Sequence, residues 1–161
     1  MRRRASTIKS PPAYESVFAI DVECVATGPK HNDRSVAQIG LVNFAGQPLL
    51  NLYVRPAEDA RVVSYLTPLT GLTRDHLYGP QALPLAEALQ VLRKWLPRDA
   101  VLVGQNIRAD VLWLGLAEGA DFGSMLDLSA LFRVWDGAKY AYFGQDHVAA
   151  VWLGVTTGPR L

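Results

Sequence analysis

Two acidic residues interrupt an otherwise apolar stretch near the start of the chain. Residues 17–26 read VFAIDVECVA, and Asp21 and Glu23 are its only charged members. The length, the β-branched content and the flanking prolines predict a buried central strand. On a strand, side chains two residues apart lie on one face, roughly 6.5–7 Å from each other. The sequence therefore predicts two neighbouring carboxylates on an interior strand.

Such a pair is costly without a counter-ion. The two charges repel each other by about 2.5 kcal/mol at an effective dielectric constant near 20, and burial removes their hydration. A divalent cation would reverse both costs. The alternative is a strand that shows its acids to water, but such a strand should alternate polar and apolar residues, and this one does not. The segment favours a metal site over a solvated face.

A third carboxylate, Asp110, follows a strand predicted at Val101–Gly104 and lies on a helix predicted at Ile107–Ala117. Ligands of open α/β sheets commonly bind at this carboxyl edge. Helical spacing places Asp110 on one face with three apolar residues, which predicts an inward side chain. An acid that only interacts with the helix dipole, worth roughly 0.3–1 kcal/mol, would suit an outward position instead. Asn106 is predicted to cap the helix or also to reach a substrate.

The composition indicates one domain. The chain has 161 residues, 50% of them hydrophobic, with a net charge of +1, so a nucleic-acid contact must come from local groups. Its single cysteine, Cys24, excludes an intrachain disulfide and favours a reducing compartment. No apolar run reaches transmembrane length. Residues 1–14 are predicted to be a basic flexible leader, with a weak nuclear signal or a transit peptide as alternatives, and residues 15–161 the folded domain.

The expected elements form an α/β fold. Three leading strands, of which the second and third form an antiparallel hairpin, precede alternating helices and strands. This order predicts a mixed sheet with helices on its faces. Beyond the elements above, the pattern predicts strands at 35–44, 49–54 and 125–129, helices at 85–96 and 145–153, and a short helix near Val62.

Five segments resemble a known family. AIDVECVATGPK, SVAQIGLVN, YVRP, SYLTPLTGLTRDHL and LVGQNIRADVLWLGL occur in this order. Together they resemble the DEDD superfamily of 3′–5′ exonucleases, and most closely the eukaryotic Rex-type RNA exonucleases, which include interferon-stimulated relatives. The resemblance runs from about Phe18 to the end of the chain. It implies the ribonuclease H-like fold, whose element order agrees with the one expected here.

The resemblance also implies a two-metal mechanism. Asp21 would bridge two Mg²⁺ or Mn²⁺ ions, Glu23 would bind the ion that activates water, and Asp110 would hold the second ion, partly through water. The substrate would be the 3′ end of a single-stranded nucleic acid, with RNA favoured over DNA. Mg²⁺ suits carboxylate and phosphate oxygens, and Mn²⁺ usually substitutes for it.

Four further residues would contact the terminal nucleotide by the same resemblance. Cys24 and Val25 would lie beneath it, while Gly71 and Leu72 would meet its sugar and base. The alternative for Gly71 is a turn glycine, and the alternative for Leu72 is a core residue. Both alternatives stay open at the level of the sequence.

The fourth metal ligand of the family is missing from its usual motif, His-x-x-x-x-Asp, which none of the three histidines begins. Tyr142 and Asp146 fit the variant Tyr-x-x-x-Asp, but Asp146 follows Asp110 too closely for the elements that the family places between them. The segment YFGQDHVAAVWLGV instead resembles the one before the last motif. We therefore expect a domain that is incomplete at its C-terminus and lacks the final helix. Asp127 is predicted to cap the segment from Leu128 rather than to bind metal.

The resemblance implies a metal-dependent 3′–5′ exonuclease domain that, as given, is inactive or weakly active because the last motif is missing. The alternative is a catalytically inactive exonuclease-like module that binds nucleic acid or protein, and a weaker option is a fold that acts on free nucleotides. The sequence predicts no membrane association and no particular protein partner. An intracellular location is expected, nuclear or nucleolar rather than cytoplasmic or organellar.

Overall fold

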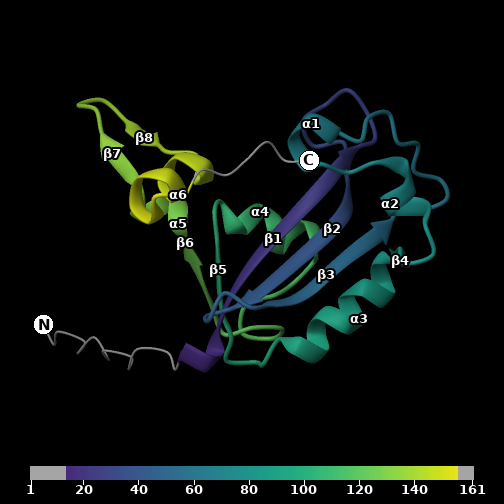
Figure 1. Cartoon of the computed structure of the whole chain (residues 1–161), viewed down its shortest axis with the longest axis horizontal. Helices are drawn as coiled ribbons and strands as arrows, with labels where there is room; N and C mark the ends of the chain where they lie inside the picture. The colour runs from purple at the N-terminus through teal and green to yellow at the C-terminus, as the bar shows by residue number, and fades with distance from the viewer. Residues whose placement is uncertain (1–13, 156–161) are drawn as a thin grey trace, which may run out of the picture.

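The computed structural model describes residues 14–155, which form a six-stranded mixed sheet with helices around it (Figure 1). The strand order is β4-β3-β2-β1-β5-β6, with β1 at the centre and antiparallel to β2. β2 is antiparallel to β3, while β5 is parallel to both β1 and β6. The strands are β1 (Val17–Ala26), β2 (Arg34–Asn43), β3 (Pro48–Arg55), β4 (Leu83–Pro84), β5 (Val101–Gly104) and β6 (Ser124–Asp127).

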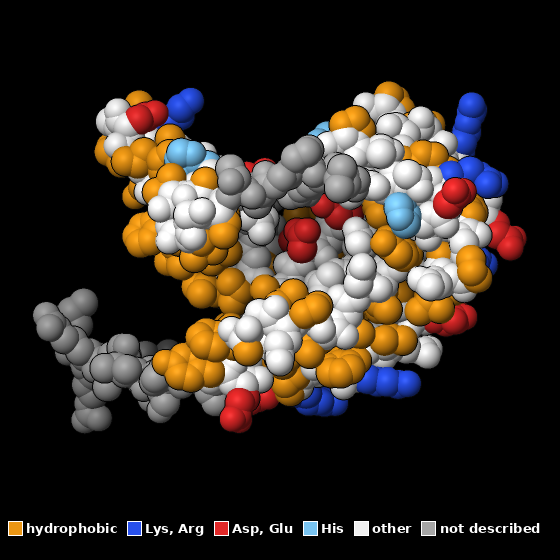
Figure 2. Space-filling model, in the orientation of Figure 1, with side chains coloured by type: hydrophobic (Ala, Val, Ile, Leu, Met, Phe, Trp, Pro, Cys, Tyr) orange, Lys and Arg blue, Asp and Glu red, His pale blue; other side chains and the backbone are white. Residues whose placement is uncertain are grey.

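The sheet is flanked by two groups of elements that leave a hollow between them. After β6 the chain forms the C-terminal lobe, residues 128–155, which stands to one side of the sheet in Figure 1. Figure 2 shows the hollow between this lobe and the opposite side of the molecule, with acidic side chains at its floor. The lobe contains α5 (Leu128–Leu131), β7 (Arg133–Trp135), β8 (Tyr140–Tyr142) and α6 (Gln145–Leu153); the other helices are α1 (Thr67–Thr70), α2 (Arg74–Tyr78), α3 (Leu85–Trp95), α4 (Ile107–Trp113) and the 3₁₀ turn η1 (Tyr14–Ser16).

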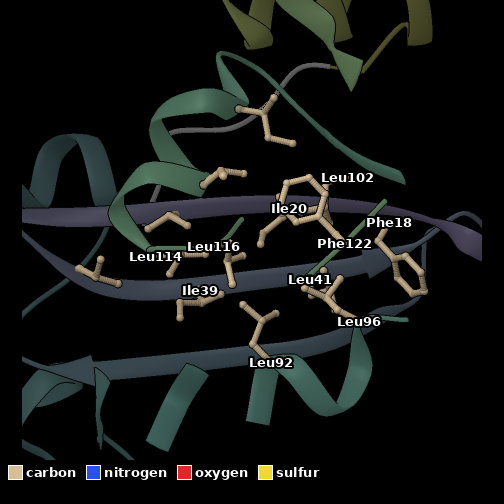
Figure 3. Packing of buried hydrophobic residues seen from close by; sticks show 14 of the residues in the cluster. Phe18, Ile20, Ile39, Leu41, Leu92, Leu96, Leu102, Leu114, Leu116 and Phe122 are labelled. Carbon is tan, nitrogen blue, oxygen red and sulfur yellow. The ribbon is translucent and has the colours of Figure 1, made fainter. Parts of the chain in front are cut away.

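The main hydrophobic core lies on one face of the sheet (Figure 3). Alternate β1 side chains, among them Ile20, point into it, together with Ile39 and Leu41 of β2. Both α3, through Leu92, and α4, through Ile107, contribute to the same cluster. The helices α3 and α4 therefore cover the same face of the sheet, because their apolar stripes belong to one core. The opposite face of the central strands stays open in the described part of the chain.

A second, smaller core closes one end of that opposite face. Val25, Ala37, Leu72 and Leu77 form it, with Tyr53 packed against them. A register shift between Glu23 and Cys24 interrupts the pairing of β1 with β2. The extra residue is Ala37 of β2, which belongs to this second core. Cys24 and Val25 are both buried although they are consecutive, because Cys24 faces the main core and Val25 the second one.

Most predicted elements are confirmed. β1, β5 and α6 have the predicted bounds, and β2, β3 and α3 differ from them by one residue at one or both ends. The antiparallel hairpin and the mixed sheet are confirmed as well. The expectation of helices on both faces is confirmed, since α3 and α4 contribute to the main core and α2, through Leu77, to the second core on the opposite face. The predicted leader lies outside the described residues, except for Tyr14, which begins η1.

Three boundaries were predicted wrongly for local reasons. Val62 lies in no helix, because the adjacent backbone pairs with the end of β1: the Val63 amide donates to the Ala26 carbonyl at 2.8 Å. α4 ends at Trp113 rather than at residue 117, because Gly115 adopts a φ of 60° and turns the chain. β6 ends at Asp127, whose side chain begins α5. No helix within residues 14–155 is long and apolar enough to cross a membrane.

Candidate active site

The two acids of β1 lie on the open face of the sheet. Phe18, Ile20 and Val22 are buried in the main core, whereas Asp21 is exposed and Glu23 is half-buried. The strand is central, as predicted, but it was wrong to expect both of its faces to be buried. The apolar Ala19, which is exposed beside Asp21 on the open face, conceals the alternation in the sequence. The carboxylates are therefore accessible to a substrate.

Asp21 lines a pocket of about 220 Å³ between the sheet and the C-terminal lobe. Its floor is formed by small side chains of β1, β2 and β5, and its wall by the lobe. The remaining lining residues are Ala19, Ile20, Gly40, Val42, Val103, Gly104, Gln105, Leu128 and Gln145. Ala19, Gly40 and Gly104 are the small residues of this floor, so a ligand can approach the backbone closely beside them.

Asp110 lies beside β1 because β5 is short. β5 pairs with β1 only as far as Ala19 and ends at Gly104, so α4 packs against the next part of this β1 edge. There the Asp110 carboxylate accepts a hydrogen bond from the Val22 backbone N–H. Asp110 is buried with its neighbours Ile107 and Val111, which confirms the predicted inward face of the helix. A strand amide thus orients a helix carboxylate.

Gly104 makes this close approach possible. A Cβ atom at this position would lie 2.9 Å from the Ile20 carbonyl oxygen and 3.3 Å from the Ile107 side chain. Real Cβ atoms do not come this close to a backbone oxygen, so any larger residue would push the β5–α4 junction away from β1. The predicted strand at Val101–Gly104 ends at this glycine, but the sequence alone does not reveal its role.

The electrostatics of the site favour a cation. Burial, and next the charge of Asp21, raise the pKa of the Asp110 carboxyl from 3.8 to about 7, against the Val22 hydrogen bond that lowers it. Glu23 adds to the increase. Burial, with the charges of Asp110 and Glu23, also raises the pKa of the Cys24 thiol to about 12, so this thiol stays protonated. A cation near these acids would displace the proton of Asp110.

The donor set fits a hard divalent cation in kind. Asp21, Glu23 and Asp110 offer carboxylate oxygens, the ligands that Mg²⁺ and Mn²⁺ prefer. Within residues 14–155, no three His, Cys, Asp or Glu side chains lie close enough together to enclose an ion by themselves. Mg²⁺ usually keeps several waters and is held by one or two carboxylates together with substrate phosphates. The arrangement therefore suits an ion that is bound jointly with its substrate.

Three of the residues predicted to contact a nucleotide are buried. Cys24 belongs to the main core, and Val25 and Leu72 to the second one, where they are 0% and 2% exposed. Gly71 ends α1 with a φ of 71°, and its N–H donates to the Thr67 carbonyl. The structure thus has Gly71 as a turn glycine and Leu72 as a core residue. Contact of the Gly71 backbone, the Leu72 side chain, Cys24 and Val25 with a nucleotide stays a prediction.

Of the two predicted helix caps, the one by Asp127 is present and the one by Asn106 is not. Asn106 precedes α4 with a φ of 56°, and its side chain makes no capping hydrogen bond, so the predicted cap is wrong. This left-handed conformation differs from the extended one in which capping side chains reach the helix amides. The Asn106 N–H donates instead to the Asp127 carboxylate at 2.9 Å, which also accepts from the Ser129 N–H at 2.9 Å. The prediction that Asp127 caps the following segment is confirmed. Asn106 is exposed, and its contact with a substrate stays a prediction.

The alternative pair, Tyr142 and Asp146, lies on the C-terminal lobe. Tyr142 is on β8 and Asp146 in the first turn of α6, and both are exposed. Gln145, not Asp146, lines the pocket beside Asp21. The ring of His147 stacks on Phe143, with centroids 5.2 Å apart. The first residue of α6, Gln145, is therefore the one that reaches the pocket, with its side-chain amide.

Gln105 and Gln145 were not predicted as site residues, and Gln145 was expected only as the first residue of a helix. Both line the pocket. The Gln105 side-chain amide also donates to the Phe143 carbonyl at 2.9 Å, which ties the lobe to the carboxyl edge of β5. The position of Gln105, directly after a strand at this edge, was the available signal.

Comparison with known proteins identifies the family. The family model described as "RNase_T: Exonuclease" matches residues 18–119, more than half of the chain. RNA exonuclease 4 of Candida glabrata is 36% identical over 94 residues, which is 58% of this chain and 34% of that protein. Human apoptosis-enhancing nuclease is 32% identical over 109 residues, 68% of this chain and 32% of that protein. The chain spans about a third of the length of these curated relatives.

Solved structures agree on the fold. The pseudoubiquitin hydrolase–RNA exonuclease module of Saccharomyces cerevisiae Pan2 superposes with a TM-score of 0.69 at 18% identity, over 96% of this chain and 26% of that one. Exonuclease I of Methylocaldum szegediense gives a TM-score of 0.61 at 16% identity, over 88% of this chain and 36% of that one. The ribonuclease H-like fold and the resemblance seen in the sequence are both confirmed. The chain belongs to the RNase_T exonuclease family and is an exonuclease domain homologous to RNA exonucleases.

Proposed function

We propose that this site removes nucleotides from the 3′ end of single-stranded RNA with the help of Mg²⁺ or Mn²⁺. The observation that carries the proposal is the electrostatic coupling of Asp110, a buried helix carboxyl, to Asp21 and Glu23 of β1: burial, and next the charge of Asp21, raise its pKa to about 7. So strong a perturbation by a carboxylate that itself lines a pocket is typical of a functional site. RNA is favoured because several relatives are named RNA exonucleases.

The residues divide the work by position. Asp21, Glu23 and Asp110 would hold the cation, which supplies charge stabilisation to the attacking and leaving oxygens when it is bound. Val22, through its N–H, keeps the Asp110 carboxylate turned toward β1. The small residues of the pocket floor leave room for the sugar–phosphate backbone beside Asp21.

A low rate is expected. No histidine lines the pocket around Asp21, so no side chain there is suited to take the proton of the attacking water at neutral pH. The loss of a general base typically lowers a rate by about 10²–10⁴-fold. This observation also supports the second candidate, an exonuclease-like module that binds nucleic acid or protein without cleaving it.

The test is a trimming assay with a 5′-labelled single-stranded RNA. We expect a ladder that shortens from the 3′ end in Mn²⁺ and stops in EDTA, and no ladder with Asp21→Asn or Asp110→Asn. Asp59→Asn, an exposed acid outside the pocket, is the matched control. Equal trimming by the wild type and Asp21→Asn would contradict the proposal. Binding without trimming at any enzyme concentration would establish the second candidate.

A nuclear or nucleolar location is a further part of the proposal, and the basic residues at the start of the chain support it. A fluorescent fusion of the full chain, compared with one in which Arg2, Arg3 and Arg4 are replaced by Ala, tests it. We expect the nuclear signal to fall in the variant, and an unchanged distribution would contradict this role of the arginines.

A further inference from the structure

We propose that the two-stranded ribbon β7–β8 is a stacking platform for the nucleotides that precede the 3′ end. The inference rests on the proposed function, since it names where the rest of the same substrate lies. The pairs Arg133–Tyr142 and Trp135–Tyr140 are opposite each other in the ribbon, so their side chains share one face. Val134 and Ala141 occupy the other face. Three aromatic rings and one guanidinium group are thus gathered on a single face.

This face is open to solvent. Trp135 is 55% exposed, Tyr140 45% and Tyr142 59%, values far above those of aromatic residues that serve a core. The rings are nevertheless ordered by one another: the Trp135 and Tyr140 centroids lie 5.2 Å apart, edge to face, and the Arg133 guanidinium stands 4.0 Å over the Tyr140 ring. Successive bases stack on such exposed rings and on arginine planes without sequence preference.

The charge of the ribbon suits a polyanion. Arg133 lies within the aromatic face, and Lys139 follows the turn. The acid of the ribbon turn, Asp136, is held in that turn, where its carboxylate accepts from the N–H groups of Ala138 and Lys139 at 2.9 and 2.8 Å. Aromatic rings interleaved with basic side chains match the sugar–phosphate backbone and bases of a single strand better than an apolar protein surface.

The ribbon is also connected to the pocket. β8 leads directly into Phe143, whose carbonyl accepts from Gln105, and then into Gln145, which lines the pocket with Asp21. From Tyr142 to Gln145 the chain can extend at most about 11 Å. A strand whose 3′ end is at Asp21 could therefore continue along the base of the ribbon toward the Trp135–Tyr140 pair.

The experiment measures the affinity of a 5′-fluorescein-labelled uridine 10-mer for the full chain by fluorescence anisotropy. The chain carries Asp21→Asn so that the RNA is not consumed. The test variant is the pair Trp135→Ala and Tyr140→Ala, next to the turn and away from the pocket. The matched control is Val134→Ala, on the opposite face of the same ribbon and 51% exposed. Melting temperatures verify that all variants are folded.

We expect the paired variant to weaken binding by about five- to a hundredfold, the usual effect of losing one stacked base, while Val134→Ala leaves it unchanged. Equal affinities in all three chains would overturn the inference, and trimming by the wild type in the same preparation would leave the proposed function standing. The absence of both binding and trimming in the wild type would overturn both.

The salt dependence gives a second readout. Arg133→Gln should flatten the plot of log affinity against log salt by about 0.7, the contribution of one phosphate contact on a single strand. Arg74→Gln is the control, because Arg74 stands over the Tyr78 ring in a comparable pair on α2, at 5.1 Å. Equal slopes in the wild type and Arg133→Gln would overturn the assignment of phosphate contact to the ribbon.

Discussion

The β1–α4 edge and the C-terminal lobe border the same pocket but are stabilised in different ways. At the β1–α4 edge, Ile20, Ile107 and Val111 are buried in the main core, and a strand amide binds a buried carboxylate. Within residues 128–155 no side chain is buried. The lobe is joined to the rest through hydrogen bonds such as that from Gln105 to the Phe143 carbonyl. We therefore propose that chemistry that needs fixed geometry takes place on the packed side, while the lobe offers a surface for binding.

The largest expected effect separates the acids of the two regions. Asp21→Asn should lower trimming by at least about a hundredfold, because the variant loses a charged oxygen for the cation. It should also abolish the Mn²⁺ affinity measured by calorimetry. Asp146→Asn, on α6, should change neither by more than about twofold. Equal losses from both substitutions would mean that the lobe supplies a metal ligand and that the Tyr142–Asp146 interpretation holds.

The second prediction compares two glycines. Gly104→Ala should destabilise the chain by about 1–3 kcal/mol in urea unfolding, because the new Cβ would lie 2.9 Å from the Ile20 carbonyl oxygen. Gly144→Ala, at the N-cap of α6, should cost less than about 1 kcal/mol, since a Cβ atom added there would meet nothing within 4 Å and only the preference of the N-cap for glycine over alanine is lost. A neutral Gly104→Ala variant would show that the β5–α4 junction is less closely packed than described.

The third prediction concerns pH. The ordinary pKa of Asp110, 3.8, rises to about 7 on folding. Between these values the folded chain keeps a proton that the unfolded chain has released, so the free energy of unfolding falls as the pH increases through this window. Asp110→Asn cannot ionise and should be more stable than the wild type by about 1–3 kcal/mol at pH 8 in EDTA, with equal stability near pH 4.

Asp121 is a control for which the stability should change with pH in the opposite direction. Its hydrogen bond from Arg93 holds its pKa below the ordinary value, so its contribution is present at neutral pH and is lost as the pH falls through the acidic range. Asp121→Asn should therefore be slightly less stable than the wild type at pH 8. Urea midpoints measured from pH 4 to pH 8 test both variants, and a wild-type curve that is flat above pH 4 would contradict the assignment to Asp110.

The sequence was informative where burial follows a period. The apolar runs of β1 and β5 and the helical spacing of Asp110 with Ile107 and Val111 were sufficient to predict those elements and the inward carboxyl. Features set by contacts distant in sequence were not predictable: the open face beneath Asp21, the pairing of Val63 with Ala26, and the left-handed conformation of Asn106. Each of these depends on a partner that local propensity does not report.

The C-terminal lobe was the least predictable region for a related reason. The strands of β7 and β8 have three residues each, and their pairing depends on the turn that Asp136 stabilises. Segments this short carry too few residues to show a period of two. Only α6 was predicted with correct bounds there. Elements this short also bury few side chains, in agreement with the absence of buried residues in 128–155.

The smallest expected effect tests how the lobe is attached. Gln105→Ala removes the side-chain amide that donates to the Phe143 carbonyl at 2.9 Å, and because this pair is exposed, global stability should fall by at most about 1 kcal/mol. Amide hydrogen exchange should accelerate in residues 140–148 while the amides of β1 keep their protection, since the lobe can open without disturbing the core. Gln47→Ala, which loses an exposed hydrogen bond to Asn43 in the β2–β3 turn, is the matched control and should leave the lobe unchanged. Faster exchange in β1 of the Gln105→Ala variant would mean that the two regions unfold together and that their contrast in packing has no dynamic consequence.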